Sequence, residues 1–270
     1  MGTNRERKDP VDGKYKKLMN NTMLFAISNF SSKLLSIVLQ PYITFAMGEV
    51  EEVGITKLVQ NIGSLLIPLV SMGVSFAIIR FGLEKQNSKS QVFTNGLVTI
   101  LLGFGLMLAF YPLLRLIPLF NTYALLLYVH VLVSCLRTLC TQFVRSRQIN
   151  RLVALDGVLC SATNLGFMLL FLSGLHLGAE GYVLALICSD ALSALFVFVI
   201  AGLRRYLRFA SFNLPLWKKM MGYALPMVPA QISFWIINAS DLFFVKVMCN
   251  GYEGQAGEYW TGLLGVGYFL

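Results

Sequence analysis

The chain has 270 residues, of which 56 % are hydrophobic and only 13 % are charged. A soluble domain carries about 25 % charged residues, and half of that fraction cannot cover a soluble globule of this length. Inside lipid, only helices and closed barrels pair all their backbone polar groups. Barrel strands alternate in polarity over about 10 residues, whereas the apolar runs here are longer and do not alternate. The composition therefore predicts an all-α, polytopic integral membrane protein.

The net charge of +9 does not indicate a nucleic-acid partner, because no soluble region displays a basic face. The five cysteines form no CxxC pair, so neither a disulfide framework nor a metal site is indicated. The basic N-terminal tail precedes an apolar run far longer than the roughly 7–15 residues of a signal peptide. We therefore expect that run to be retained as the first span.

Seven apolar segments are long enough to cross a membrane as helices, which takes about 20 residues each. They lie at residues 20–47, 55–82, 91–116, 122–144, 152–174, 180–202 and 220–248. An eighth begins near Tyr259, and the residues from there to Leu270 are too few to cross a hydrocarbon core about 30 Å thick. From the sequence we expect a truncated form of a longer protein, or else a short remnant.

The connections between these segments alternate in charge. Most of the 22 Lys and Arg residues lie in the N-terminal tail and in every second connection, namely at 80–89, 145–151 and 204–219. The opposite connections carry mainly glutamates, at positions 49, 51, 52, 180, 253 and 258. This one-sided placement follows the positive-inside rule and predicts a cytoplasmic N-terminus. The segment 203–219 fits either a helix in the cytoplasmic interface or a basic topological anchor.

Polar residues recur at helical spacing within several spans, so that those of one span share a face. They are Asn29, Lys33, Ser36 and Gln40; His130, Ser134, Arg137 and Thr141; Asp156, Thr163 and Asn164; Asp190 and Ser193; and Gln231, Asn238 and Asp241. A charge at a helix centre costs about 2.5–3.5 kcal/mol on insertion scales. The three central charges, Lys33, Arg137 and Asp190, therefore predict a water-accessible cavity. For the hydroxyl groups, hydrogen bonds between helices are the better explanation.

Proline interrupts two of the predicted spans, at Pro68 in the second and at Pro226 and Pro229 in the seventh. Proline frees carbonyl groups within a helix, and broken helices often mark hinges or binding sites in transporters. No phosphate loop, H-E-x-x-H or G-x-S-x-G sequence occurs, so the chain offers no support for an ATPase, a membrane protease or a lipase. We predict that it is not an enzyme and needs no cofactor.

The seventh span gives a resemblance to a known family. The sequence YALPMVPAQISFWIINASD, from Tyr223 to Asp241, resembles span seven of the Wzx-type polysaccharide flippases, members of the multidrug/oligosaccharidyl-lipid/polysaccharide (MOP) exporter superfamily. The sequence NFSSK, which ends at Lys33, and the run Glu52-Val53-Gly54 also fit that family. Phe243 departs from it, since a charged or polar residue often stands there.

The resemblance implies two six-helix lobes of the MATE/MOP type around a central cavity. This chain would supply a basic cytoplasmic tail at 1–19, the first lobe at 20–202, a basic cytoplasmic linker at 203–219, and span seven with the start of span eight at 220–270. Because this is little more than one lobe, we expect only part of the cavity to come from these residues.

The resemblance also implies a task, which is to move an undecaprenyl-diphosphate-linked oligosaccharide across the cytoplasmic membrane for surface polysaccharide biosynthesis. Membrane lipids and a glycan polymerase machinery are the other implied partners. The implied substrate-cavity residues are Asn29, Lys33, Gln40, His130, Arg137, Gln231 and Asn238, with the cations attracting the diphosphate and the amides facing sugar hydroxyls. Asp190 and Asp241 are the candidates for carrying a coupling ion.

Three alternatives stay open. A MATE-type drug or cation exporter would favour an acidic cavity over the mixed one predicted here. A membrane polymerase or ligase of surface glycans would carry a large extracellular loop, which these residues lack. A non-transporting scaffold or remnant is favoured if the protein stops at Leu270.

Overall fold

The computed structural model describes residues 19, 22–23, 39, 41–47, 50–111, 118–250 and 257–267. Within these ranges every regular element is a helix, so the predicted all-α class is confirmed. Most of the predicted first span, including Asn29, Lys33 and Gln40, lies outside the described residues.

The helices follow the predicted spans closely. Their bounds are α2 Val50–Ser71, α3 Val74–Leu83, α4 Lys89–Ala109, α6 Pro118–Ser146, α7 Asn150–Met168 with a π-helical end η1 Leu169–Gly174, α8 Gly178–Ile200, α9 Leu214–Ala224, α10 Met227–Met248 and α11 Gly257–Gly267. Six segments of the described ranges are long and apolar enough to cross a membrane, if α7 is counted with η1 and α9 with α10. The predicted second and seventh spans are each divided into two helices.

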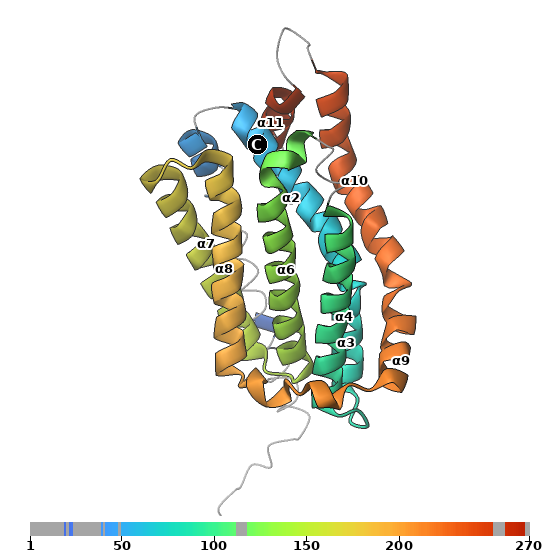
Figure 1. Ribbon diagram of the computed structural model, residues 1–270. Coiled ribbons are helices and arrows are strands. Elements are labelled where there is room, and N and C mark those ends of the chain that lie inside the picture. Colours follow the sequence, from blue (N-terminus) through green and yellow to red (C-terminus); the bar gives the residue numbers. More distant parts are fainter. Residues whose placement is uncertain are drawn as a thin grey trace, which may run out of the picture.

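The helices run side by side in an up-and-down bundle (Figure 1). α6 packs against α8, α3 and α2, and α7 packs against α8. On the other side of α6, α9 lies against α3, while α10 and α11 lie against α2. The described core contains large buried side chains such as Phe93, Phe143 and Ile78. Leucines on the outer faces, such as Leu102 and Leu195, are more than half exposed (54 % and 58 %), as expected for surfaces that meet lipid.

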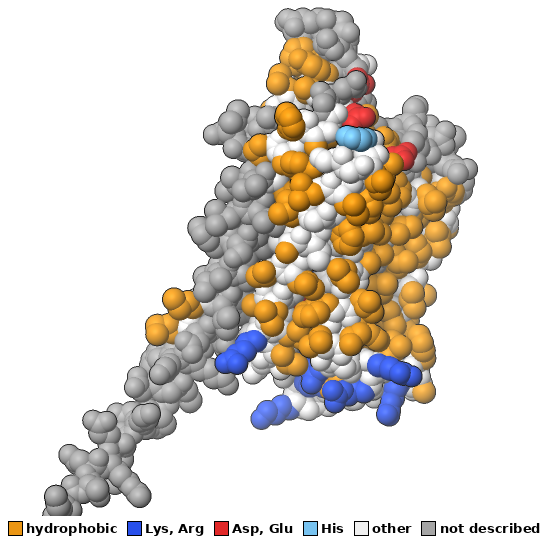
Figure 2. Space-filling model, turned by 90° about the vertical axis from the view of Figure 1, so that its left-hand side faces the viewer, with side chains coloured by type: hydrophobic (Ala, Val, Ile, Leu, Met, Phe, Trp, Pro, Cys, Tyr) orange, Lys and Arg blue, Asp and Glu red, His pale blue; other side chains and the backbone are white. Residues whose placement is uncertain are grey.

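On the face of the bundle that Figure 2 shows, the exposed charged side chains lie at the two ends. Figure 2 shows Lys and Arg side chains gathered at one end, and Asp, Glu and His side chains at the opposite end. The basic end is where α3 leads into α4, α6 into α7 and α8 toward α9. The flank between the two ends is largely hydrophobic. For the connections that the structure describes, the predicted alternation is therefore present in three dimensions.

The segment after α8 is not one continuous interfacial helix. It forms two 3₁₀ turns, η2 Leu203–Tyr206 and η3 Phe209–Ser211, and is tied to α4. Asn95 Nδ2 donates to the Asn213 carbonyl at 3.1 Å, and the Asn213 backbone N–H donates back to Asn95 Oδ1 at 3.1 Å. The Asn213 side chain also caps α9, which has proline in its first turn. This cap starts α9 at Leu214, earlier than the predicted 220.

The two divided spans break next to each other. The turn between α2 and α3 places Met72 and Gly73 at positive φ, 48° and 64°. The turn between α9 and α10 contains Pro226, which cannot donate a backbone hydrogen bond. A Cβ atom added to Gly73 would lie only 2.8 Å from the Ala224 carbonyl oxygen, so the two breaks are in direct contact. The predicted interruptions are confirmed, although the first falls at Gly73 rather than at Pro68.

Substitution of Gly73 tests this contact. We expect Gly73→Ala to lower the apparent melting temperature of the purified protein, because alanine at positive φ costs about 1–2 kcal/mol and its Cβ would meet the Ala224 carbonyl. Gly105→Ala in α4 is the control, since its Cβ would have no neighbour within 4 Å and alanine favours a helix. Equal melting temperatures for the two variants would contradict this account of the paired breaks.

Candidate functional site

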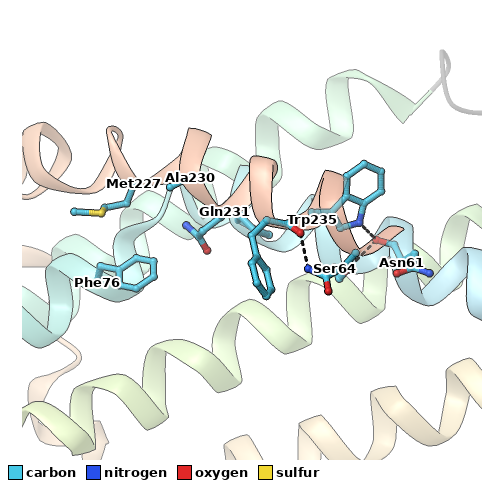
Figure 3. Close-up of a pocket in the computed structure, with 10 residues that line it drawn as sticks. Asn61, Ser64, Phe76, Met227, Ala230, Gln231 and Trp235 are labelled. Atoms are coloured by element: carbon cyan, nitrogen blue, oxygen red, sulfur yellow. Dashed lines mark hydrogen bonds between the residues drawn. The ribbon is translucent and has the colours of Figure 1, made fainter. Parts of the chain in front are cut away.

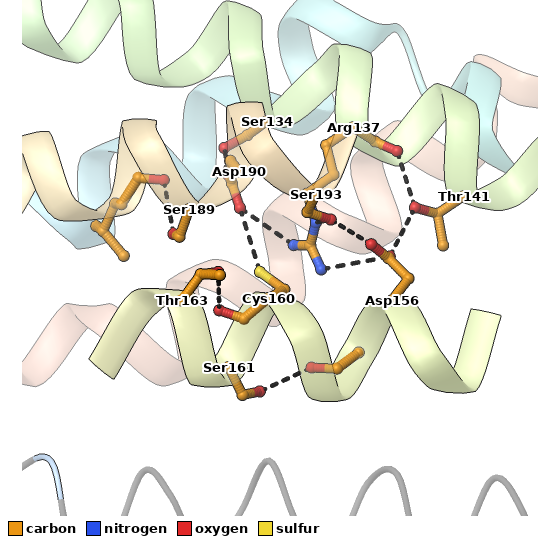
Figure 4. Close-up of polar contacts among 12 residues, drawn as sticks. Ser134, Arg137, Thr141, Asp156, Cys160, Ser161, Thr163, Ser189, Asp190 and Ser193 are labelled. Carbon is orange, nitrogen blue, oxygen red and sulfur yellow. Dashed lines mark hydrogen bonds and ion pairs between the residues drawn. The ribbon is translucent and has the colours of Figure 1, made fainter. Parts of the chain in front are cut away.

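Three charged side chains from three helices meet inside the bundle. Arg137 of α6 reaches Asp190 of α8, with 3.2 Å between Nη1 and Oδ1, and Asp156 of α7, with 3.8 Å between Nη2 and Oδ2. Figure 4 shows the guanidinium group between the two carboxylates. We call these three residues the charge cluster. The structure thus joins two predicted site residues, Arg137 and Asp190, and adds Asp156.

Hydroxyl groups complete the hydrogen bonding of the charge cluster. Ser193 Oγ accepts from Arg137 Nε at 2.7 Å and donates to Asp156 Oδ1. Ser134 Oγ donates to Asp190 Oδ2. These bonds satisfy carboxylate oxygens that would otherwise be buried without a partner, which is a heavy cost in a low-dielectric interior.

Helical spacing explains why these residues meet. Ser134 and Arg137 are three residues apart on α6, as are Asp190 and Ser193 on α8, so each pair shares one face. Since α6 and α8 pack against each other and both contact α7, the two faces and Asp156 converge. Arg137 lies nine residues before the end of α6, which places it about 14 Å from the basic end of the bundle. The charge cluster therefore lies within the hydrocarbon layer.

The formal charges of the charge cluster do not sum to zero. One guanidinium faces two carboxylates, so full ionisation leaves one negative charge in excess. The exposed fractions of the side chains are 29 % for Arg137, 14 % for Asp190 and 1 % for Asp156. Chemically, the arrangement can take up one proton or one monovalent cation, and Asp190 is the more accessible carboxylate. Among the described residues no group of three or more His, Cys, Asp or Glu side chains is placed to hold a metal ion.

His130 lies two turns from Arg137 on α6 but is directed toward α2. A Cβ atom added to Gly63 of α2 would lie 3.2 Å from His130 Cδ2, so the imidazole ring fills the space that this glycine leaves. Its buried Nδ1 has no hydrogen-bond partner among the described residues. The structure therefore places His130 at the α2–α6 contact, beside the charge cluster rather than in it.

The two predicted amides of the seventh span line a separate pocket. This pocket has a volume of about 450 Å³ and lies between α10 and the broken α2–α3 segment. Gln231 and Asn238 line it together with Asn61, Ser64 and Trp235. In Figure 3 the labelled side chains of the three helices surround the space between them. We call it the amide pocket.

Asp241 belongs to neither group of residues. It lies one turn beyond Asn238 on α10, and its Oδ1 accepts a hydrogen bond from the Leu242 backbone N–H at 2.9 Å. It is not among the residues that line the amide pocket. α8 and α10 lie on opposite sides of the bundle (Figure 1), so the structure does not bring Asp241 to Asp190.

Comparison with known proteins assigns the family. The sequence matches the family described as "Polysaccharide biosynthesis protein" over residues 18–268. The chain belongs to this family. No curated protein sequence is similar enough to be matched to it.

Comparison with solved structures shows that the chain has the MATE/MOP fold. It superimposes on the structure of a MATE transporter in complex with Br-NRF with a TM-score of 0.58 and 19 % sequence identity. The superposition covers 93 % of this chain and 59 % of the other chain. It also superimposes on a MOP superfamily transporter from Pyrococcus furiosus, whose binding pocket is described as of reverse polarity, with a TM-score of 0.56 and 19 % identity, which covers 93 % and 60 %. The chain thus spans about three fifths of these transporters, and the predicted family resemblance and fold are confirmed.

The charge cluster makes a prediction about stability. Arg137→Met leaves two carboxylates without their cation, and breaking a buried pair in this way costs about 3–5 kcal/mol, less here because Arg137 is partly exposed. We expect the triple variant Arg137→Met, Asp156→Asn, Asp190→Asn to melt at a higher temperature than Arg137→Met alone, as measured on purified protein. If the triple variant is no more stable than the single one, the three charges do not depend on one another.

Proposed function

We propose that this protein moves a lipid-linked oligosaccharide from the cytoplasmic to the outer leaflet of the cytoplasmic membrane during surface polysaccharide biosynthesis. The observation that carries the proposal is the charge cluster, which lies inside the hydrocarbon layer of a MATE/MOP fold. A bundle that only held itself together would not need three charges there, because their insertion is costly. The family supports a saccharide-bearing substrate.

The ionic end of such a substrate is the part that hydrocarbon excludes. A diphosphate needs cations during the crossing, and Arg137 and Lys33 are the candidates. Arg137 is shared by two carboxylates, so neutralising one of them makes part of its guanidinium group available to a phosphate. Asp190 suits that role because it is more exposed than Asp156. Protonation of Asp190 would weaken its hold on Arg137 Nη1, and this would couple ion uptake to substrate binding.

The remaining predicted residues are part of the same proposal. Asn29 and Gln40 are proposed to contact sugar hydroxyls, His130 to line the cavity near α2, and Asp241 to serve as a second ion-binding carboxylate. Undecaprenyl diphosphate is the proposed lipid carrier, and glycan polymerase machinery is a proposed partner. The proposed division of the chain is a tail at 1–19, a first lobe at 20–202, a linker at 203–219 and the start of a second lobe at 220–270.

The proposed orientation puts the basic end of the bundle in the cytoplasm. The positive-inside rule supports it, since Lys and Arg gather at that end. A cysteine at Arg204 should then be alkylated by an impermeant reagent only from the cytoplasmic side. Alkylation only from the outside would reverse the orientation.

A drug or cation exporter is the second candidate function. The excess carboxylate of the charge cluster favours it, since a cationic substrate could replace the missing positive charge. The family match favours the oligosaccharide instead. Export of cationic dyes by the purified protein in vesicles, without any effect on lipid-linked oligosaccharide, would select this second candidate.

Transport can be tested by complementation. We expect a deletion strain to accumulate lipid-linked oligosaccharide in the inner leaflet, and Arg137→Glu or Lys33→Glu to leave that accumulation uncorrected, because reversed charges repel the diphosphate. Lys85→Glu is the control, since Lys85 is an exposed residue at the end of the bundle. Full surface polysaccharide with Arg137→Glu present at the wild-type level in the membrane would refute the cationic role.

A further inference from the structure

The amide pocket lies where the two broken helices meet. Pro68 and Phe76 line it on either side of the α2–α3 turn, and Met227 lines it just after the α9–α10 turn. From Met227 to Asn238 it follows α10 for about 16 Å. Its volume of about 450 Å³ falls in the range of roughly 300–1,000 Å³ that is usual for small-molecule sites.

The described residues that line the amide pocket carry no charge. They are Asn61, Ser64, Pro68, Phe76, Met227, Ala230, Gln231, Phe234, Trp235 and Asn238. An organic cation would call for a carboxylate, and a diphosphate for Arg or Lys. The lining therefore favours a neutral occupant, and the ionic end of a substrate is left to the charge cluster, which shares no residue with the pocket.

The polar groups of the amide pocket suit a ligand rich in hydroxyl groups. A primary amide offers two donors and an acceptor, and each hydroxyl can both donate and accept. Gln231 Nε2 is buried and has no hydrogen-bond partner among the described residues. An unpaired amide at membrane depth costs free energy, and a ligand hydroxyl would supply the missing acceptor.

Trp235 provides a fixed aromatic surface in the same pocket. Its Nε1 donates to the Asn61 carbonyl at 2.7 Å, and the Ser64 hydroxyl donates to that same carbonyl at 2.6 Å. The ring also contacts Phe243, with 5.8 Å between the ring centroids. The indole is thus held in place before any ligand arrives, with an apolar face that suits the C–H surface of a sugar ring.

A second pocket, with an apolar lining, provides a comparison. It has a volume of about 410 Å³ and lies between α2 and α4, and none of the described residues that line it has an amide, hydroxyl or charged side chain. An acyl chain would pack well against such a lining. The same acyl chain would form no hydrogen bonds with Asn61, Gln231 and Asn238, so lipid binding does not explain the amides of the amide pocket.

We infer that the amide pocket binds a neutral sugar residue of the transported oligosaccharide, which stacks on Trp235 and hydrogen-bonds to Gln231. The inference rests on the proposed function and adds that two separate sites bind the substrate. The charge cluster binds its ionic end, and the amide pocket binds a sugar.

The fluorescence of Trp235 can be used to test this inference. The chain has three tryptophans, so Trp217→Phe and Trp260→Phe leave Trp235 as the sole indole. The probes are the lipid-linked oligosaccharide purified from a strain that lacks this protein, and undecaprenyl diphosphate without sugar. Binding of each is measured both as total ligand retained by the protein and as the change in Trp235 fluorescence. We expect both probes to be retained and only the sugar-bearing one to change the fluorescence.

Variants separate the hydrogen bond from general packing. We expect Gln231→Leu to weaken binding of the sugar-bearing probe about threefold to tenfold, the effect of losing a hydrogen bond, and to leave binding of the sugar-free probe unchanged. Leu106→Ala, in the apolar pocket between α2 and α4, is the matched control and should change neither.

The outcomes distinguish the inference from the proposed function. Equal changes of Trp235 fluorescence with the two probes would overturn the sugar subsite and indicate a lipid in the pocket. Retention of both probes with no change at Trp235 would overturn the subsite while the proposed function stands. If the protein retains neither probe, both the subsite and the proposed function fail.

Discussion

The placement of Arg137 inside the hydrocarbon layer is the constraint on which α6, α7 and α8 depend. A guanidinium group there needs anions and hydrogen-bond acceptors around it, and Asp156, Asp190 and Ser193 supply them from the two neighbouring helices. The three helices are therefore joined by charge as well as by apolar packing. Two carboxylates for one cation leave the arrangement able to respond to a proton or an ion, which an apolar core could not do.

On the other side of the bundle, two spans are interrupted rather than continuous. The α2–α3 span breaks at Gly73 and the α9–α10 span at Pro226, and the two breaks are in contact. Broken helices at membrane depth are tolerated where they are packed against protein or line a cavity, and here they do both. The two halves of the candidate site thus differ in chemistry: an ionic group among α6, α7 and α8, and a neutral pocket between α2, α3 and α10.

Much of this could be predicted from the sequence, for physical reasons. Long apolar runs and one-sided basic connections define the spans, because lipid excludes unpaired backbone groups and loops retain the charges. Spacing put Ser134 and Arg137 on one face of a helix. The predicted central charges do not include Asp156, which stands near the start of the predicted span 152–174. In the structure Asp156 lies six residues into α7 and Arg137 nine residues before the end of α6, so the two reach similar depth. Trp235 and Asn61 could not be paired from sequence, since their contact joins a side chain to a backbone carbonyl 174 residues away.

The central claim is that the charge cluster is in contact with water, and cysteine chemistry tests it most directly. In a protein whose five native cysteines are replaced, a cysteine at Asp190 is compared with one at Leu195, on the exposed apolar surface of the same helix. Thiol reagents attack the thiolate, which does not form in lipid. The account predicts that a small hydrophilic reagent modifies the cysteine at 190 and leaves the one at 195 unmodified. Equal resistance at both positions would contradict it.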